Sequence, residues 1–389
     1  MYSSSRFSEL IQEIPKSAFQ SIVSDTKNDR YVKSLKTWDL LLLMIYGQVE
    51  QSQSLRQLVN GYNLHEQHHY HLNTSKIKRS TLSDALGSRS VEAFKALSDL
   101  LMQKLARTQR KELNSLTTLI DATPIKLLNQ RFRSWTEGTQ TPRSRGLKVH
   151  VAMNLDNSAI TYANITAPNV NDIQDVKNIP IEPGRTYVFD KGYSSYKWWH
   201  EINQKGAVFV TRIKRNSLYK CLPSNQHMSV GSVVSDDTIM LSNKCPRARA
   251  NNPYSFKPIR LVRVAREEGK PPLDLITNDF ERSSQEISQL YKDRWQIELL
   301  FKWIKQKLKL KTFFGQSENA VKIQIHCALI AYMLILLLKQ SRPNCTNLYE
   351  LMMELKYGLF QRHKTEYAYY RKRKKEQNEL KKFQGVLNL

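Results

Sequence analysis

The hydrophobic pattern of the sequence changes its period twice, and this limits the possible folds more than any other feature. From Phe19 to about Leu105, apolar residues recur at helical spacing, as in TWDLLLLMIYGQV and SVEAFKALSDLLMQKL. At Leu116 short β-rich runs begin, and from Ser283 the pattern is mostly helical again as far as Leu355. The chain is therefore predicted to have a mixed α/β fold in which helical segments flank a β-rich region.

The β-rich region begins with five short runs, LTTLIDA, LKVHVAMNL, AITYANITA, TYVFD and AVFVTRI. The first three are expected to form an antiparallel meander, and the last two fit a βα connection through the helical segment YKWWHEINQKG. Trp198 and Trp199 in that segment are predicted to pack the helix against the sheet. After Arg212 the pattern is less clear, with SFKPIRLVRVARE and PPLDLITND as further candidate strands.

The charge of the chain indicates a polyanionic partner. Lys and Arg number 60 against 35 acidic residues, a net charge of +25, and nucleic acid is the natural candidate. A membrane surface could also attract this charge, but the apolar run from Ile325 to Leu338 is too short to span a bilayer and is predicted to be a buried helix. The first residues have no apolar signal core and the four cysteines form no CxxC pair, so we expect a cytoplasmic setting and no membrane partner.

Three acidic residues could form one site. Asp121 ends the first β-rich run on the same side as Leu119, Asp190 ends the run TYVFD, and Glu298 lies on a later helix. Taken singly, each could be a turn former or part of a solvated helix face. Three carboxylates without a convergent Cys or His would make an all-oxygen site for magnesium or manganese, and a pair of such ions suits phosphoryl transfer.

The stretch YKDRWQIELLFKWIK carries a line of polar residues at the edge of a buried stripe. On a regular helix, Tyr291, Arg294, Glu298 and Lys305 fall within an arc of roughly 60°. Asp293 points roughly 140° away from Glu298, so a cap or a surface pair is its predicted role.

These motifs resemble those of a known family. DAT at Asp121, DKGY at Asp190, and Tyr, Arg, Glu and Lys separated by two, three and six residues are similar to the signature of DDE transposases of the bacterial insertion-sequence four family, of the cut-and-paste type. The segments IPKSAFQSIV and RSTLSDA also look like the domain that precedes the catalytic core in one branch of that family. The resemblance covers nearly the whole chain and is weakest after Gln361.

The resemblance implies a ribonuclease H-like core interrupted by a β-rich insertion and preceded by a helical DNA-binding domain. The long interval between Asp190 and Glu298 independently favours an insertion. The expected limits are 1–112 for the N-terminal helical DNA-binding domain, 113–211 and 282–345 for the two parts of the core, 212–281 for the insertion, and 346–389 for a helical basic C-terminal region.

The resemblance also implies roles for individual residues. Asp121, Asp190 and Glu298 would be catalytic and would bind two Mg²⁺ or Mn²⁺ ions. Tyr291, Arg294 and Lys305 would hold DNA phosphates near the cut. Further DNA contacts would come from Arg212, Lys191 and Trp295, although Trp295 could equally be a core aromatic.

The resemblance implies cleavage at the terminal inverted repeats of the element and strand transfer into target DNA. The expected partner is double-stranded DNA, and the expected assembly is a homodimer at the nucleoid. A nuclease that does not join strands and a DNA-binding protein descended from a transposase remain alternatives.

Three other segments have open interpretations. LHEQHHYH could bind a metal, although a polar loop is favoured. KRSTLSDALGSR, with hydroxyl residues suited to N-capping and Gly87 to close the helix, could dock on phosphates or form a solvated hairpin. The charged tail after Gln361 could contact DNA or form a solvated helix.

Overall fold

The structure is a computed structural model that describes residues 5–109, 116–136, 145–222, 231–242, 251–255, 257–267, 269–308, 312–342 and 347–361. The basic tail after Gln361, for which a DNA-contacting arm was one expectation, lies outside the described residues. Contacts between Cα atoms divide the chain into two compact units. We call them the helical unit, Met1–Leu101 with Gln306–Leu389, and the sheet unit, Met102–Lys305. The segment 282–345, expected to be the second part of the core, is thus shared between both units.

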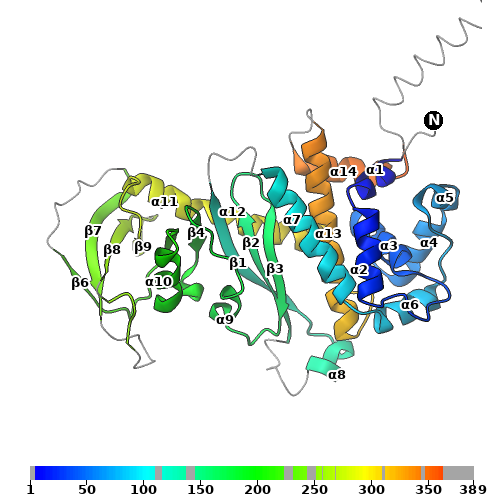
Figure 1. Cartoon of the computed structure of the whole chain (residues 1–389), viewed down its shortest axis with the longest axis horizontal. Coiled ribbons are helices and arrows are strands. Elements are labelled where there is room, and N and C mark those ends of the chain that lie inside the picture. Colours follow the sequence, from blue (N-terminus) through cyan, green and yellow to red (C-terminus); the bar gives the residue numbers. More distant parts are fainter. Residues whose placement is uncertain are drawn as a thin grey trace, which may run out of the picture. The chain divides into compact units, whose positions relative to one another are not determined.

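The sheet unit is built on one mixed sheet of nine described strands (Figure 1). Their order is β3-β2-β1-β4-β5-β9-β8-β7-β6. The β1–β4 and β4–β5 pairs are parallel and the other pairs are antiparallel. The strands are β1 (Thr117–Lys126), β2 (Gly146–Asn154), β3 (Ile160–Thr166), β4 (Thr186–Phe189), β5 (Val208–Arg212), β6 (Tyr219–Cys221), β7 (Val233–Leu241), β8 (Pro258–Val264) and β9 (Leu273–Thr277).

The predicted meander and βα connection are both present. β1, β2 and β3 pair antiparallel in sequence order, and helix α10 (Tyr196–Gln204) connects the parallel strands β4 and β5. As predicted, Trp198 and Trp199 pack α10 on the sheet: Trp198 lies 4.7 Å from the ring centre of Phe189, and Trp199 stacks at 5.4 Å on Phe209. The remaining helical segments of this unit are η2 (Gln130–Phe132), α8 (Arg133–Thr136), α9 (Asp172–Val176), η3 (Lys191–Tyr193), α11 (Ser284–Asp293) and α12 (Trp295–Lys307).

The β-rich stretch after Arg212 continues the same sheet. β9 pairs with β5, and β8, β7 and β6 follow outward. Sequence patterns predicted β8 and β9 but missed β6 and β7. Helix α11 begins directly after Ser283, where the sequence predicted a return to helix, and it starts with a capping box in which Ser283 and Glu286 satisfy each other's backbone N–H groups. It packs against β4, β5, β7 and β8.

The helical unit is built on one apolar helix, α13 (Glu318–Ser341) (Figure 1). This helix is long and apolar enough to cross a membrane, but 94% of its most apolar window is buried inside the protein, so it is the buried core helix that the sequence predicted. It packs against α1, α3, α6 and α14. The other helices of this unit are α1 (Arg6–Gln12), α2 (Lys16–Asp25), α3 (Thr37–Val49), α4 (Leu55–Asn63), η1 (Glu66–His68), α5 (His69–Leu72), α6 (Arg79–Ser88), the start of α7 (Glu92–Gln109) and α14 (Leu348–Gly358).

Three histidines of the histidine-rich segment pack against neighbouring groups of the helical unit. The rings of His65 and His68 stack on Phe360 at 4.0 and 5.2 Å, and His69 Nε2 lies 3.1 Å from the carbonyl oxygen of Tyr62. The segment forms short helical turns, where the sequence favoured a loop. A packing role therefore accounts for these three histidines, whereas His71 is exposed.

Candidate active site

Strand register and alternation bring Asp121 and Asp190 to one place. The parallel pairing of β1 with β4 ends at Ile120 and Phe189, so the next residue on each strand is one of the two aspartates. Side chains alternate along a strand, and Ile120 and Phe189 both belong to the core under α10, so the two aspartates project to the opposite face. Asp121 does not end its strand as expected, because β1 continues to Lys126 along β2.

Helices α11 and α12 bring further polar groups to the aspartates. The hydroxyl of Tyr291 donates to Asp190 Oδ1 at 3.0 Å. Arg294 donates through Nη1 to Asp121 Oδ2 at 3.0 Å and through Nη2 to Glu298 Oε1 at 2.6 Å. The three acids predicted from the sequence therefore meet on one face of the sheet unit, with Arg294 between two of them.

The helix expected to carry this polar line is interrupted at Arg294. α11 ends at Asp293 and α12 begins at Trp295, but Arg294 itself keeps right-handed helical dihedrals, with φ −50° and ψ −28°. The direction of the side chains therefore changes little across the break, and Tyr291, Arg294 and Glu298 face the same site.

Two more predicted residues reach this site from its edges. Lys305 Nζ donates to Thr123 Oγ1, and a guanidinium nitrogen of Arg212 lies 3.8 Å from Asp190 Oδ1. Thr123 was not predicted, although it lies two residues beyond Asp121 and so on the same side of β1. Extending the alternation past Asp121 would have found it.

The remaining predicted residues differ in their surroundings. Trp295 is 58% exposed, so it is not the core aromatic that was its alternative role. Lys191 is exposed in η3, directly after Asp190. Asp293 accepts a hydrogen bond from Gln289 at the surface, 2.9 Å away, which is the surface pair predicted for it.

A buried polar cluster supports the loop that follows Asp190. Asp175 is 3% exposed and accepts hydrogen bonds from Tyr162 and Asn164. Its helix, α9, packs against η3, and a Cβ on Gly192 would lie only 3.2 Å from Asp172 Oδ2. The close approach of α9 therefore favours glycine in the DKGY turn.

Comparison with known proteins places this site in a family. The family described as "Transposase DDE domain" matches residues 113–334, more than half of the chain and all of the site. The chain belongs to this family. A second family, a domain of unknown function (DUF4372), matches residues 3–73 of the transposase.

Three curated relatives are transposases by description. The y4zB protein of Sinorhizobium fredii is 40% identical over 258 residues, which are 65% of this transposase and 69% of the relative. The transposase of insertion sequence element IS5377 from Geobacillus stearothermophilus is 27% identical over 278 residues, 69% of each chain. That of IS4SA from Synechocystis is 25% identical over 322 residues, 78% of this transposase and 82% of the relative. The piggyBac transposase synaptic complex with hairpin DNA superposes with a TM-score of 0.43 and 12% identity, covering 90% of this chain and 77% of that one.

These findings confirm the main expectations from the sequence. The protein is a DNA transposase, an enzyme that cleaves DNA and transfers strands, with a mixed α/β fold and a transposase DDE domain. DNA is its partner, and membership of the family implies the use of a divalent metal ion.

The electrostatics of the transposase site are dominated by burial of charge. Burial raises the pKa of Asp121 to about 6, and the neighbouring charges of Glu298 and Asp190 add to this effect, against the bond from the Ala122 amide and the charge of Arg294. Burial also raises the pKa of Tyr291, with Asp190 contributing, so its hydroxyl stays protonated and donates to that carboxylate. The three carboxylates thus repel one another across a partly dry site.

The donor set fits a hard divalent cation. It consists of carboxylate oxygens from β1, the end of β4 and α12, the ligands that magnesium and manganese prefer. In the described part of the chain, no group of three acidic, histidine or cysteine side chains is close enough to hold a metal ion as arranged. The guanidinium of Arg294 lies between Asp121 and Glu298, so both can ligate one ion only after this side chain moves.

Proposed function

We propose that Asp121, Asp190 and Glu298 are the catalytic carboxylates of this transposase and that they hold two Mg²⁺ or Mn²⁺ ions. The observation that supports this most is their convergence: three acids distant in sequence lie on one face of the sheet unit, each bonded or close to Tyr291, Arg294 or Arg212. When bound, such ions activate an attacking hydroxyl or water and stabilise the leaving oxygen of the phosphodiester.

The basic residues of the site are proposed to hold the DNA strand. Arg294 has a planar fork that binds phosphate as well as carboxylate, so it can exchange Asp121 and Glu298 for a phosphate of the substrate. Lys305 and Arg212 would hold neighbouring phosphates from either side, and the exposed Lys191 would extend this surface. Exposed Trp295 would stack on a base near the cut.

The substrate proposed for this site is the pair of terminal inverted repeats of the transposase's own insertion sequence, with target DNA as acceptor. A homodimer would hold the two ends together, in the bacterial cytoplasm at the nucleoid. The ribonuclease H-like character of the core and the domain limits expected from the sequence also stay proposals, and residues 1–112 are proposed as a DNA-binding region that folds together with the C-terminal helices.

The test compares purified variants in a cleavage assay on end-containing DNA. Asp121→Asn, Asp190→Asn and Glu298→Gln should each abolish magnesium-dependent cleavage while keeping the circular dichroism spectrum and DNA binding, because each removes one ligand charge. Asp293→Asn is the matched control and should keep substantial cleavage, since Asp293 contacts Gln289 at the surface. Normal cutting by Glu298→Gln, or a dead Asp293→Asn, would refute the assignment.

A second assay separates the proposal from its alternatives. Pre-cleaved ends with free 3′ hydroxyls should be joined to target DNA by the wild-type chain. Cleavage without joining would indicate a nuclease, and binding without either reaction would indicate a DNA-binding protein.

A further inference from the structure

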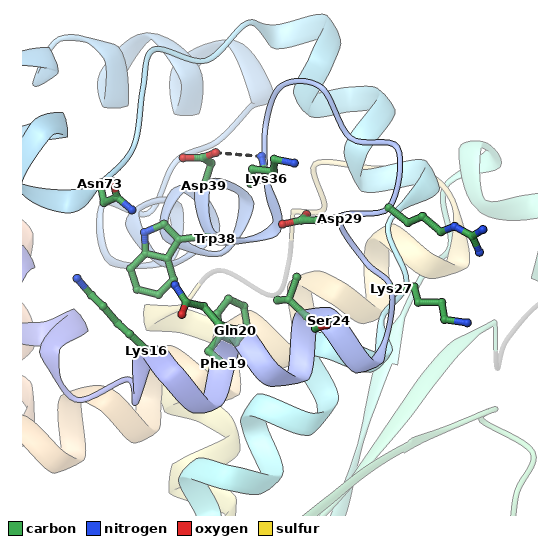
Figure 2. Close-up of a pocket in the computed structure, with 12 residues that line it drawn as sticks. Lys16, Phe19, Gln20, Ser24, Lys27, Asp29, Lys36, Trp38, Asp39 and Asn73 are labelled. Atoms are coloured by element: carbon green, nitrogen blue, oxygen red, sulfur yellow. Dashed lines mark hydrogen bonds between the residues drawn. The ribbon is translucent and has the colours of Figure 1, made fainter.

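A pocket of about 830 Å³ opens in the part of the helical unit that matches the domain of unknown function. Helix α2 forms one wall, and the chain from Lys27 to the start of α3 forms the other, together with Asn73 (Figure 2). Its volume lies within the range of about 300–1,000 Å³ typical of ligand sites.

Basic side chains surround the pocket. Lys16, Lys27, Arg30 and Lys36 line it, against two carboxylates. Figure 2 shows Lys16 and Lys27 towards opposite ends of α2. All four basic side chains belong to exposed residues. The Lys36 ammonium donates to the Val32 carbonyl at 2.8 Å, so Lys16, Lys27 and Arg30 are the side chains offered to an anion at the mouth of the pocket.

The two carboxylates hold the protein itself together. Asp29 accepts hydrogen bonds from the amide and hydroxyl of Thr37 at 2.8 and 2.7 Å. Asp39 accepts from the Lys36 amide at 2.9 Å and from Thr74 Oγ1 at 2.7 Å. Their oxygens are therefore engaged by local donors that fix the start of α3.

An aromatic ring lies between the basic residues. Trp38 is anchored through its indole N–H, which donates to the Leu72 carbonyl at 3.0 Å, and its ring packs against buried Phe19. The ammonium of exposed Lys16 lies over the indole ring, 5.6 Å from its centre, so a base that stacks on this face would replace the lysine.

The loop that carries Lys27 and Arg30 has an unusual backbone. Lys27, Tyr31 and Leu35 have positive φ angles of 53°, 61° and 23°, which residues with a side chain rarely adopt. Such conformations persist only where surrounding contacts impose them, and they are concentrated at ligand sites. Here the bonds of Asp29 and Asp39 help to hold this loop in place.

We propose that this pocket binds an unpaired nucleotide of DNA, with Trp38 stacking on the base and Lys27 and Arg30 holding the flanking phosphates. An anchored aromatic ring within a basic recess is the combination that binds single-stranded nucleic acid. The bases of an intact duplex are stacked on one another and could not reach the ring. The inference rests on the proposed function, because an enzyme that cuts duplex ends exposes unpaired nucleotides.

The test measures binding of the intact chain to a fluorescent oligothymidylate by anisotropy over a range of salt concentrations. The double variant Lys27→Gln with Arg30→Gln should bind about tenfold more weakly and show a salt slope smaller by about 0.7 per lost phosphate contact. Lys33→Gln is the matched control, since Lys33 is exposed in the same loop but does not line the pocket. An equal loss in Lys33→Gln would refute the proposal, because general charge would then explain the binding.

A second comparison tests stacking. Wild type should bind an abasic oligonucleotide of the same length about tenfold more weakly than oligothymidylate. Trp38→Phe should keep this preference and Trp38→Ala should lose it, with circular dichroism confirming that both fold. Equal wild-type affinity for both oligonucleotides would overturn the proposal.

Cleavage of duplex ends by wild type is scored separately. If wild type cleaves but shows no base preference, the pocket proposal fails and the proposed function stands. If it binds through the pocket but does not cleave, only the proposed function fails.

Discussion

Arg294 is the side chain on which the arrangement of the candidate site most depends. It binds two of the three carboxylates, its side chain is only 15% exposed, and its Nε has no hydrogen-bond partner among the described residues. The guanidinium of Arg294 offsets the repulsion between the Asp121 and Glu298 carboxylates, and its Nε–H group remains an unused hydrogen-bond donor. It can therefore stabilise the site before substrate arrives and contact a phosphate afterwards.

Arg294→Ala and Lys305→Ala should impair cleavage far more than binding. Most of the net charge lies elsewhere, so affinity for end-containing DNA should change only a few-fold. Single-turnover cleavage should fall by about 100-fold or more, because a contact at the reacting phosphate acts on the transition state.

The matched controls are Lys292→Ala and Lys302→Ala, which remove exposed lysines from α11 and α12. Both should cleave within a few-fold of wild type. Wild-type rates in Arg294→Ala would show that this arginine does not contact the reacting phosphate.

The raised pKa of Asp121 should make metal binding depend on pH. Its folded pKa of about 6 lies above the ordinary pKa of 3.8 for an aspartate, so the unfolded chain releases this proton at lower pH. The metal-free fold should therefore lose stability, up to about 3 kcal/mol, as pH rises from about 4 to about 6. A divalent ion binds the deprotonated form, so its stabilising effect should appear as pH rises through about 6.

The melting temperature, measured with and without magnesium below and above about pH 6, tests both the loss of stability and the stabilisation by the ion. Asp121→Asn is the control and should show neither the loss nor the gain. A magnesium-induced shift in melting temperature that is equal at both pH values would contradict the assigned coupling.

Sequence alone indicates which candidate residues share a side, because local rules decide which side of a strand or helix a residue occupies. Spacings of 3, 4 and 7 keep Tyr291, Arg294 and Glu298 on one face even across the helix break, and alternation fixes Asp121. The contact of Arg294 with both Asp121 and Glu298 could not be predicted, because it depends on the tertiary position of α12 over β1.

At the scale of elements, the sheet after Arg212 is tied together by a buried ion pair. Arg260 on β8 pairs with Asp236 on β7, and the two side chains are 9% and 4% exposed. Arg260 also donates to the carbonyl oxygens of Asp279 and Arg282, just before α11. One side chain thus links two strands to the loop from which α11 starts.

Asp236→Ala should lower the free energy of unfolding by about 3–5 kcal/mol, because it leaves the guanidinium buried without its partner. The double variant Asp236→Ala with Arg260→Met should regain much of this loss. Chemical denaturation of all forms measures it, with Asp237→Ala on the same strand as control. A double variant as unstable as Asp236→Ala would show that the loss does not come from the unpaired charge.

The same pair explains why β7 was not predicted. Asp236 and Asp237 interrupt the apolar alternation of VVSDDTIML. A buried aspartate is stable at this position because Arg260 on β8 pairs with it, and this partner cannot be read from the sequence of β7.

The start of α6 was also predicted wrongly. Lys78, without a side-chain cap, precedes the helix, and Gly87 lies within its last turn.

At the scale of the whole molecule, the helical unit is discontinuous in sequence. α13 packs against α1, α3 and α6, and Arg6 donates to Glu354 at 2.8 Å and to the Gly358 carbonyl at 3.1 Å. Sequence periodicity identified these helices but could not show that the first and last segments form one core.

A fragment of residues 1–112 should therefore not fold by itself, because it lacks α13. We expect it to be insoluble or molten, with poorly dispersed amide signals in NMR spectra. Co-expression with residues 306–389 should restore a soluble complex, whereas co-expression with 102–305 should not. A well-folded 1–112 fragment would show that the N-terminal helices have a sufficient core of their own.

The discontinuity of the helical unit also affects how the chain is made. α3 has almost every side chain buried, and its partner α13 is synthesised roughly 270 residues later. At ribosomal rates of about 5–20 residues per second, this apolar helix waits for some tens of seconds without its partner. During that time the sheet unit can emerge completely, while the first helices remain a target for chaperones. A message truncated before α13 would then yield a chain that carries the candidate carboxylates. Its N-terminal helices would lack their packing partner and would be prone to proteolysis.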